Sequence, residues 1–99
     1  MKLESENAPT LRNPDARGIT DSLAAVQGFA ILSKDEMTYI QTSGSATSGF
    51  VLEYQEGDTD QHYRCPDTLS LPQVTKAFLS YAQGTDSWKT ALNWEKEDL

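Results

Sequence analysis

The sequence has very few of the residues that form disulfides and metal centres. Cys65 is the only cysteine and His62 the only histidine among 99 residues. A single cysteine excludes a disulfide within the chain and is typical of a reducing compartment. Zinc sites use about four ligands and draw mainly on Cys and His, so the sequence predicts no metal site. His62 and Cys65 are three residues apart, which on a strand places them on opposite faces and argues against a thiol–imidazole pair.

Long hydrophobic runs are lacking as well. No apolar stretch approaches the roughly 20 residues that a membrane-spanning helix needs. The first residues, MKLESE, lack the apolar segment of a secretory signal. We therefore expect a cytoplasmic protein without membrane association. Hydrophobic residues still make up 37% of the chain, which is too many for a wholly disordered protein and enough for one modest core.

Positive charge is scarce. Eight Lys and Arg residues face fifteen Asp and Glu residues, and the formal net charge is −7. Such a chain repels a phosphate backbone, so we expect no nucleic-acid partner. An acidic surface suits a basic protein partner, although many acidic proteins bind nothing basic.

Motifs that mark common enzymes are also missing. Residues 44–49 form a small polar loop without the Gly-Lys-Ser/Thr ending of a phosphate loop. The sequence contains no Gly-x-Ser-x-Gly nucleophile elbow. Asp58 and Asp60 resemble the start of a calcium loop, but a strand follows where further oxygen ligands are needed. We expect no cofactor, and the pattern favours a protein that is not an enzyme.

What the chain does carry is a clear hairpin pattern over residues 48–66. Phe50, Leu52 and Tyr54 alternate with more polar residues, which predicts a strand with one buried face. An acidic turn with one glycine follows, and residues 61–65 form the second strand. This hairpin also holds the single histidine and the single cysteine, so we expect any chemistry of the protein to lie here.

The register of this hairpin follows from side-chain parity. If Tyr54 and Tyr63 both face the core, they pair with one another, and Glu53 then lies opposite Arg64 on the outer face. A loop one residue longer would bring Tyr54 beside His62 and break the pattern.

The outer face of the hairpin is the candidate recognition surface. Its polar residues are Glu53, Gln55, His62 and Arg64, with Arg64 as a two-pronged anchor for a partner carboxylate. Trp94 stands among charged residues and is the better of the two tryptophans as a contact residue. The alternative interpretation is that these residues form the ordinary solvated face of a half-buried sheet.

Before the hairpin, the sequence predicts an arm, a helix and two strands. Residues 1–13 have few apolar side chains and are expected to form a flexible arm, followed by a single domain over residues 14–99. Asn13 and Pro14 are typical of a helix start. Ile19, Leu23 and Val26 form the apolar stripe of that helix. Gly28 is expected to end it.

The remaining elements complete an α+β pattern. Residues 29–32 and 37–42 are the first two strands of a four-stranded antiparallel meander. Ser70 and Gln73 form a capping box at the start of a C-terminal helix, which ends at Gly84. A further short helix follows Asp86, and residues 93–99 fit an edge strand, a helix or a tail. We predict a two-layer sandwich, with N-terminal and C-terminal helices covering one face of the meander.

Several segments carry a resemblance. They are FAIL at 29–32, MTYIQ at 37–41, GFVLEYQEG at 49–57, HYR at 62–64, and later Val74, Ala77, Phe78, Leu79, Tyr81, Gly84, Trp88 and Trp94. Together they resemble a family of small bacterial proteins of uncharacterised function, which implies no catalytic residues. In size, acidity and helix-flanked sheet the chain is also similar to some bacterial toxin-immunity proteins, which implies a protein-binding role.

Three functional hypotheses follow. The first is a cytoplasmic, non-enzymatic protein-binding module. The second is a small enzyme or ligand-binding protein with a pocket between sheet and helices, bordered by Tyr39, Tyr54 or His62. The third is a structural module that associates with itself through its sheet, so that the protein is a monomer or a homodimer.

Overall fold

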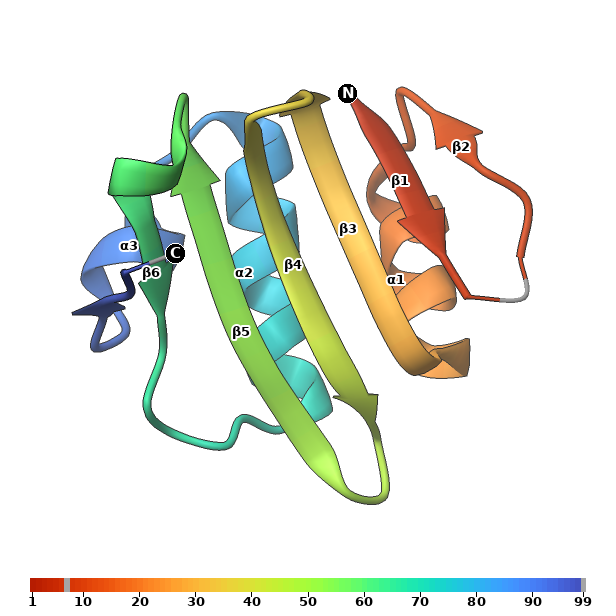
Figure 1. Cartoon of the computed structure of the whole chain (residues 1–99). Coiled ribbons are helices and arrows are strands. Elements are labelled where there is room, and N and C mark those ends of the chain that lie inside the picture. Colours follow the sequence, from red (N-terminus) through yellow and green to blue (C-terminus); the bar gives the residue numbers. More distant parts are fainter. Residues whose placement is uncertain (7, 99) are drawn as a thin grey trace.

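The computed structural model describes residues 1–6 and 8–98. Its strands are β1 (Lys2–Ser5), β2 (Leu11–Arg12), β3 (Gln27–Asp35), β4 (Thr38–Ser45), β5 (Gly49–Glu56), β6 (His62–Arg64) and β7 (Glu95–Lys96). Its helices are α1 (Ala16–Ala25), α2 (Leu71–Gln83), α3 (Ser87–Thr90) and the 3-10 turn η1 (Thr59–Gln61). Within the described residues, all seven strands form one antiparallel sheet in the order β2-β1-β3-β4-β5-β6-β7 (Figure 1). The α+β class is confirmed, but the sheet has seven strands where the sequence predicts four.

The extra strands at the start of the chain correct the prediction of a flexible arm over residues 1–13. β1 pairs with β3 along its whole length, and β2 pairs with the other edge of β1. Leu3 is only 1% exposed and belongs to the core. Hydrogen bonds on both edges hold β1 in the sheet, so one buried apolar side chain is enough to fix it against the core. A strand of four residues with one apolar position shows little alternation, and the sequence pattern therefore does not reveal it.

The first helix forms where the apolar stripe predicts it, but with different ends. Its N-cap is Asp15 rather than Asn13, and the Asp15 carboxylate accepts a hydrogen bond from the backbone N–H of Gly18 at 2.8 Å. The helix ends before Gly28, which lies in β3 with φ 136°. A side chain at position 28 would collide with the Glu6 carboxylate, so this glycine permits a close approach of two segments rather than a helix stop.

The central hairpin has the register that parity predicts. Tyr54 lies opposite Tyr63 and Glu53 lies opposite Arg64. The two tyrosine rings stack with their centroids 5.0 Å apart. The predicted pairing is therefore confirmed. This register is enforced because a slip by one residue would move the buried residues of β5 to the other face of the sheet.

The helix α2 also begins and ends as predicted. The Ser70 hydroxyl accepts a hydrogen bond from the backbone N–H of Gln73, and the Gln73 side chain accepts one from the backbone N–H of Ser70. Gly84 closes the helix in the left-handed conformation, with φ 76°. None of the helices in the described part of the chain is long and apolar enough to cross a membrane.

The core lies between the sheet and the helices. Figure 1 shows α1 and α2 on the same side of the sheet. Buried hydrophobic side chains from both layers meet there; those that are almost completely buried include Leu3, Ile19, Leu23, Leu32, Ile40, Phe50, Leu52, Val74 and Phe78. We call the opposite side, which none of the described helices covers, the open face.

The role of Leu3 gives a direct test of the N-terminal strand. We expect Leu3→Ala to lower the free energy of unfolding by about 2–5 kcal/mol, because it leaves a cavity in the core. The partly exposed neighbour Lys2 is the control, and Lys2→Ala should change stability by no more than about 0.5 kcal/mol. Urea unfolding followed by tryptophan fluorescence measures both. Equal, small effects would show that residues 1–13 are an arm after all.

Tyr81 gives a test of the core through its pH dependence. Its hydroxyl is buried and finds no hydrogen-bond partner among the described residues. Burial, and then repulsion by Glu56 and Asp35, raises the pKa of Tyr81 from 10.0 to about 12. Between these two values the unfolded chain loses the proton while the folded chain keeps it, so folding stability must fall as pH rises from 10 to 12.

We therefore expect Tyr81→Phe to lose less stability than the wild type over this pH range. Below pH 10 the variant should be as stable as the wild type or more stable, because it removes an unsatisfied buried hydroxyl. Urea unfolding at several pH values on both sides of pH 10 gives the comparison. Parallel curves for the two proteins would contradict the assignment.

Candidate functional site

The four predicted hairpin residues all lie on the open face, but they are not equally exposed. Arg64 is exposed and Glu53 is partly exposed, whereas Gln55 and His62 are each only 3% exposed. The expectation of a fully solvated patch is therefore wrong for Gln55 and His62. Side chains from β4 and from the C-terminal segment lie against them, and sequence parity alone cannot detect such neighbours.

A hydrogen-bond network fixes Gln55 and one side of the His62 ring. The Gln55 amide nitrogen donates to the backbone carbonyl of Met37 at 3.1 Å, which directs the amide oxygen the other way. That oxygen accepts a hydrogen bond from the Tyr39 hydroxyl at 3.3 Å and lies 3.0 Å from Nδ1 of His62. Because the oxygen only accepts, Nδ1 carries the hydrogen and donates it.

Two carboxylates face the other side of the ring. Nε2 of His62 lies 3.1 Å from Glu53 Oε1 and 3.8 Å from Glu97 Oε1. Glu97 lies beside the His62 ring because β7 pairs with β6, and the backbone N–H of Glu97 donates to the backbone carbonyl of His62 at 2.8 Å. The sequence analysis missed Glu97, since only this long-range strand pairing brings it beside the hairpin. We call Glu53, His62 and Glu97 the carboxylate–histidine cluster.

The two carboxyl groups of the cluster have opposite pKa shifts. Burial alone would raise the pKa of Glu53, but hydrogen bonds with Glu97, His62 and Gln41 and the attraction of His62 together hold it below its usual value. The pKa of Glu97 is raised, first by hydrogen bonding to Glu53, and then by burial and by repulsion from that carboxylate. Of the pair, Glu97 is therefore the group that takes up a proton first.

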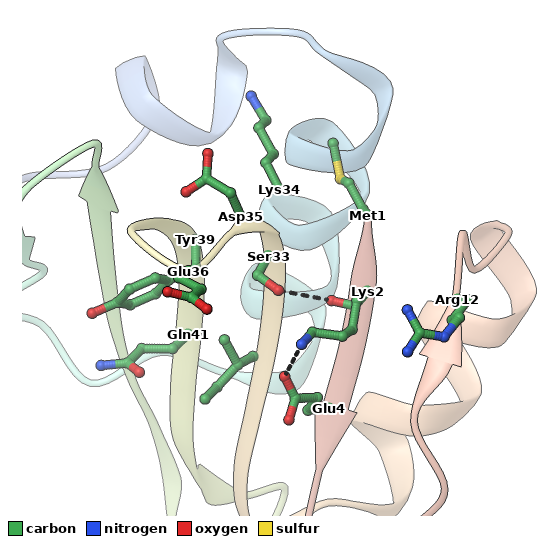
Figure 2. Close-up of a pocket in the computed structure, with 11 residues that line it drawn as sticks. Met1, Lys2, Glu4, Arg12, Ser33, Lys34, Asp35, Glu36, Tyr39 and Gln41 are labelled. Carbon is green, nitrogen blue, oxygen red and sulfur yellow. Dashed lines mark hydrogen bonds and ion pairs between the residues drawn. The ribbon is translucent and has the colours of Figure 1, made fainter.

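A hollow of about 710 Å³ lies beside this network on the open face. It is lined by Met1, Lys2, Glu4, Arg12, Ile31, Ser33, Lys34, Asp35, Glu36, Tyr39 and Gln41. Figure 2 shows Asp35, Glu36 and Tyr39 on one side of the hollow and Lys2 and Arg12 on the other. Most residues that line the hollow are polar or charged, whereas the pocket of a small ligand is usually lined by apolar side chains.

The hollow and the hydrogen-bond network around His62 share two side chains. Tyr39 and Gln41 line the hollow, and each also bonds into the network. Tyr39 donates to Gln55, and the Gln41 amide donates to Glu53 Oε2 at 3.4 Å. The open face is therefore one connected surface, with a hollow at one end and a buried polar network at the other.

Trp94 lies away from this surface, at the end of the core. Its ring packs edge-on against Tyr54 and Trp88, with centroid distances of 4.7 and 6.1 Å. Its Nε1–H donates to the backbone carbonyl of Lys89 at 3.0 Å. The structure therefore gives Trp94 a packing role, and it does not bring Trp94 together with the hairpin residues.

The geometry is poorly suited to acid–base catalysis. A catalytic histidine must reach a substrate proton directly or through one water molecule. Both nitrogens of His62 already face protein groups, and the ring is almost fully buried. Cys65, the other reactive type, is buried and points to the core.

No protein-family model matches the chain, and comparisons with curated proteins and with solved structures likewise give no match.

The network predicts a large difference between two glutamines. Gln55→Leu would leave the Nδ1–H of His62 and the hydroxyl of Tyr39 without their partner, at a cost of about 2–4 kcal/mol in the free energy of unfolding. Gln41→Leu removes one long hydrogen bond from a partly exposed side chain, so it should cost less than about 1 kcal/mol. Thermal and urea unfolding of both variants checks this, and costs of the same size would refute the special role of Gln55.

Proposed function

We propose that this protein is a non-enzymatic protein-binding module that holds a basic protein on its open face. The observation that carries the proposal is the hollow on that face, where Tyr39, Asp35 and Glu36 line one side (Figure 2). The formal net charge of −7 favours the approach of a basic partner and disfavours an acidic one.

The chemistry of this side of the hollow suits a Lys or Arg side chain. An aromatic ring attracts a cation over its face, and nearby carboxylates pair with the charge. The pKa of Tyr39 is raised by burial and by the neighbouring Glu53, so the phenol stays neutral near pH 7. Lys2, on the other side, is already paired with Glu4 at 3.2 Å. Arg12 lies there as well and would take an acceptor of the partner, which fixes the orientation of docking.

The other two hypotheses find less support. Tyr39 and His62 lie on the open face while Tyr54 packs in the core, so the three do not border one pocket between sheet and helices. The outermost strands, β2 and β7, have two residues each, which leaves little edge for pairing with a second copy. A monomer therefore fits the proposal better than a homodimer.

The proposal also covers the setting of the protein. We place it in the cytoplasm of a bacterium, with an immunity-like role in which one acidic protein neutralises a basic one. The size, acidity and helix-flanked sheet of the chain support the immunity-like role. The single cysteine, Cys65, is a free thiol and supports a reducing compartment such as the cytoplasm.

A pull-down with two charge-matched variants tests the proposal. Asp35→Asn with Glu36→Gln removes two negative charges from the hollow, and Asp35→Asn keeps the side-chain oxygen that bonds the backbone N–H of Met37. Asp58→Asn with Asp60→Asn removes the same charge from the hairpin turn. We expect a basic protein to be captured in stoichiometric amount by the wild type and by the turn variant, and to be lost with the hollow variant.

The purified partner then gives a quantitative check by calorimetry. The hollow variant should bind it about tenfold more weakly or worse, equivalent to about 1.4 kcal/mol, and the turn variant should match the wild type. Equal weakening in both variants would indicate unspecific charge attraction. Capture of no basic protein, or of an acidic one, would overturn the proposal.

A further inference from the structure

The ligand atoms of the carboxylate–histidine cluster are placed as a metal ion would require. Nε2 of His62 and one oxygen each of Glu53 and Glu97 lie within 4.8 Å of one another. Nε2 lies 3.1 Å from the Glu53 oxygen and 3.8 Å from the Glu97 oxygen. Ligand atoms about 2.0–2.2 Å from a zinc ion lie roughly 3–3.5 Å apart, so small side-chain adjustments suffice to close the three around one ion.

The tautomer of His62 leaves its Nε2 side in need of a proton or a metal ion. Its Nδ1–H is donated to the Gln55 oxygen, whose orientation is fixed by the bond from Gln55 to the Met37 carbonyl. In the neutral ring, Nε2 therefore presents a lone pair directly toward the Glu53 oxygen. Two lone pairs at 3.1 Å repel each other unless a proton or a metal ion lies between them.

Glu97 provides a second and independent observation. Its Oε1 atom is buried and, while Glu53 and Glu97 are both ionised, has no hydrogen-bond partner within the described residues. Leaving a carboxylate oxygen buried without a donor or a cation is costly. This oxygen is directed at the Nε2 side of His62, at 3.8 Å, where a bound ion would satisfy it.

The residues around the cluster orient it as an outer shell does in metal sites. Gln55 holds the far nitrogen of the His62 ring, and Gln41 donates to the second oxygen of Glu53. Such partners fix the tautomer of a ligating histidine and the direction of a ligating carboxylate. The Glu97 side chain is 33% exposed, so an ion can enter from solvent and retain water in its remaining positions.

We propose that Glu53, His62 and Glu97 bind one divalent transition-metal ion of the zinc type. One imidazole and two carboxylates are ligands that Zn²⁺ accepts, and a fourth position stays open to water. The sequence analysis predicts no metal site because it considers only Cys and His as ligands and cannot place Glu97 beside His62. This site is separate from the proposed docking of a partner and does not depend on it.

Zinc titration of the chelator-treated protein tests the site. Because His62 is the only histidine, its ring nitrogens give unambiguous signals in ¹⁵N NMR spectra. On addition of one equivalent of Zn²⁺ at neutral pH we expect the Nε2 signal to move to the position of a metal-bound nitrogen while Nδ1 keeps its hydrogen. Calorimetry should show one ion bound per chain.

Two neighbouring glutamates on the C-terminal segment provide matched variants. Glu97→Gln removes a ligand and should weaken zinc binding tenfold or more, whereas Glu95→Gln, which is exposed on β7, should bind like the wild type. The variant Asp35→Asn with Glu36→Gln should also bind zinc normally, which separates this result from the fate of the docking proposal. Circular dichroism without zinc shows whether each variant is folded.

Three results would overturn the site. The first is a His62 spectrum of the wild type that does not change in excess Zn²⁺, which would assign the ring a purely structural role as an imidazolium between carboxylates. The second is normal zinc binding by Glu97→Gln. The third is an equal loss in Glu95→Gln, which would mark diffuse binding to an acidic surface. The wild-type spectrum decides the matter even if a variant fails to fold.

Discussion

The two-residue alternation of β5 is the constraint on which both sides of the molecule depend. Phe50, Leu52 and Tyr54 face the helices and anchor the core, while Glu53 and Gln55 face the other way and begin the polar network. The pairing of β5 with β6 carries this division to the next strand and places His62 against Gln55. A slip of one residue would bury the carboxylate and expose the ring of Tyr54, so a single register holds the core and the site together.

Sequence reasoning succeeded where the determining contacts are local. The register of the hairpin follows from parity over a few residues, and the ends of α2 follow from Ser70, Gln73 and Gly84. These signals come from residues that are close together in the sequence, so the order of the residues reveals them.

It failed where distant segments meet. The strand β1 depends on pairing with β3, and β7 depends on pairing with β6, about thirty residues away along the chain. The burial of His62 and the presence of Glu97 follow from that last pairing, so the sequence analysis named Glu53, Gln55 and His62 but missed Glu97. Trp94 packs against Tyr54 and Trp88, a placement that its charged neighbours in the sequence do not indicate.

The position of the first and last strands also bears on how the molecule folds. The neighbours β3, β4 and β5 are joined by short turns and can pair as soon as they are made, whereas β1 must wait for β3 and β7 must wait until nearly the whole chain exists. Local pairings form faster than those that close long loops. We therefore expect the carboxylate–histidine cluster to be assembled in the last step of folding, after the hydrophobic layer beneath it has formed.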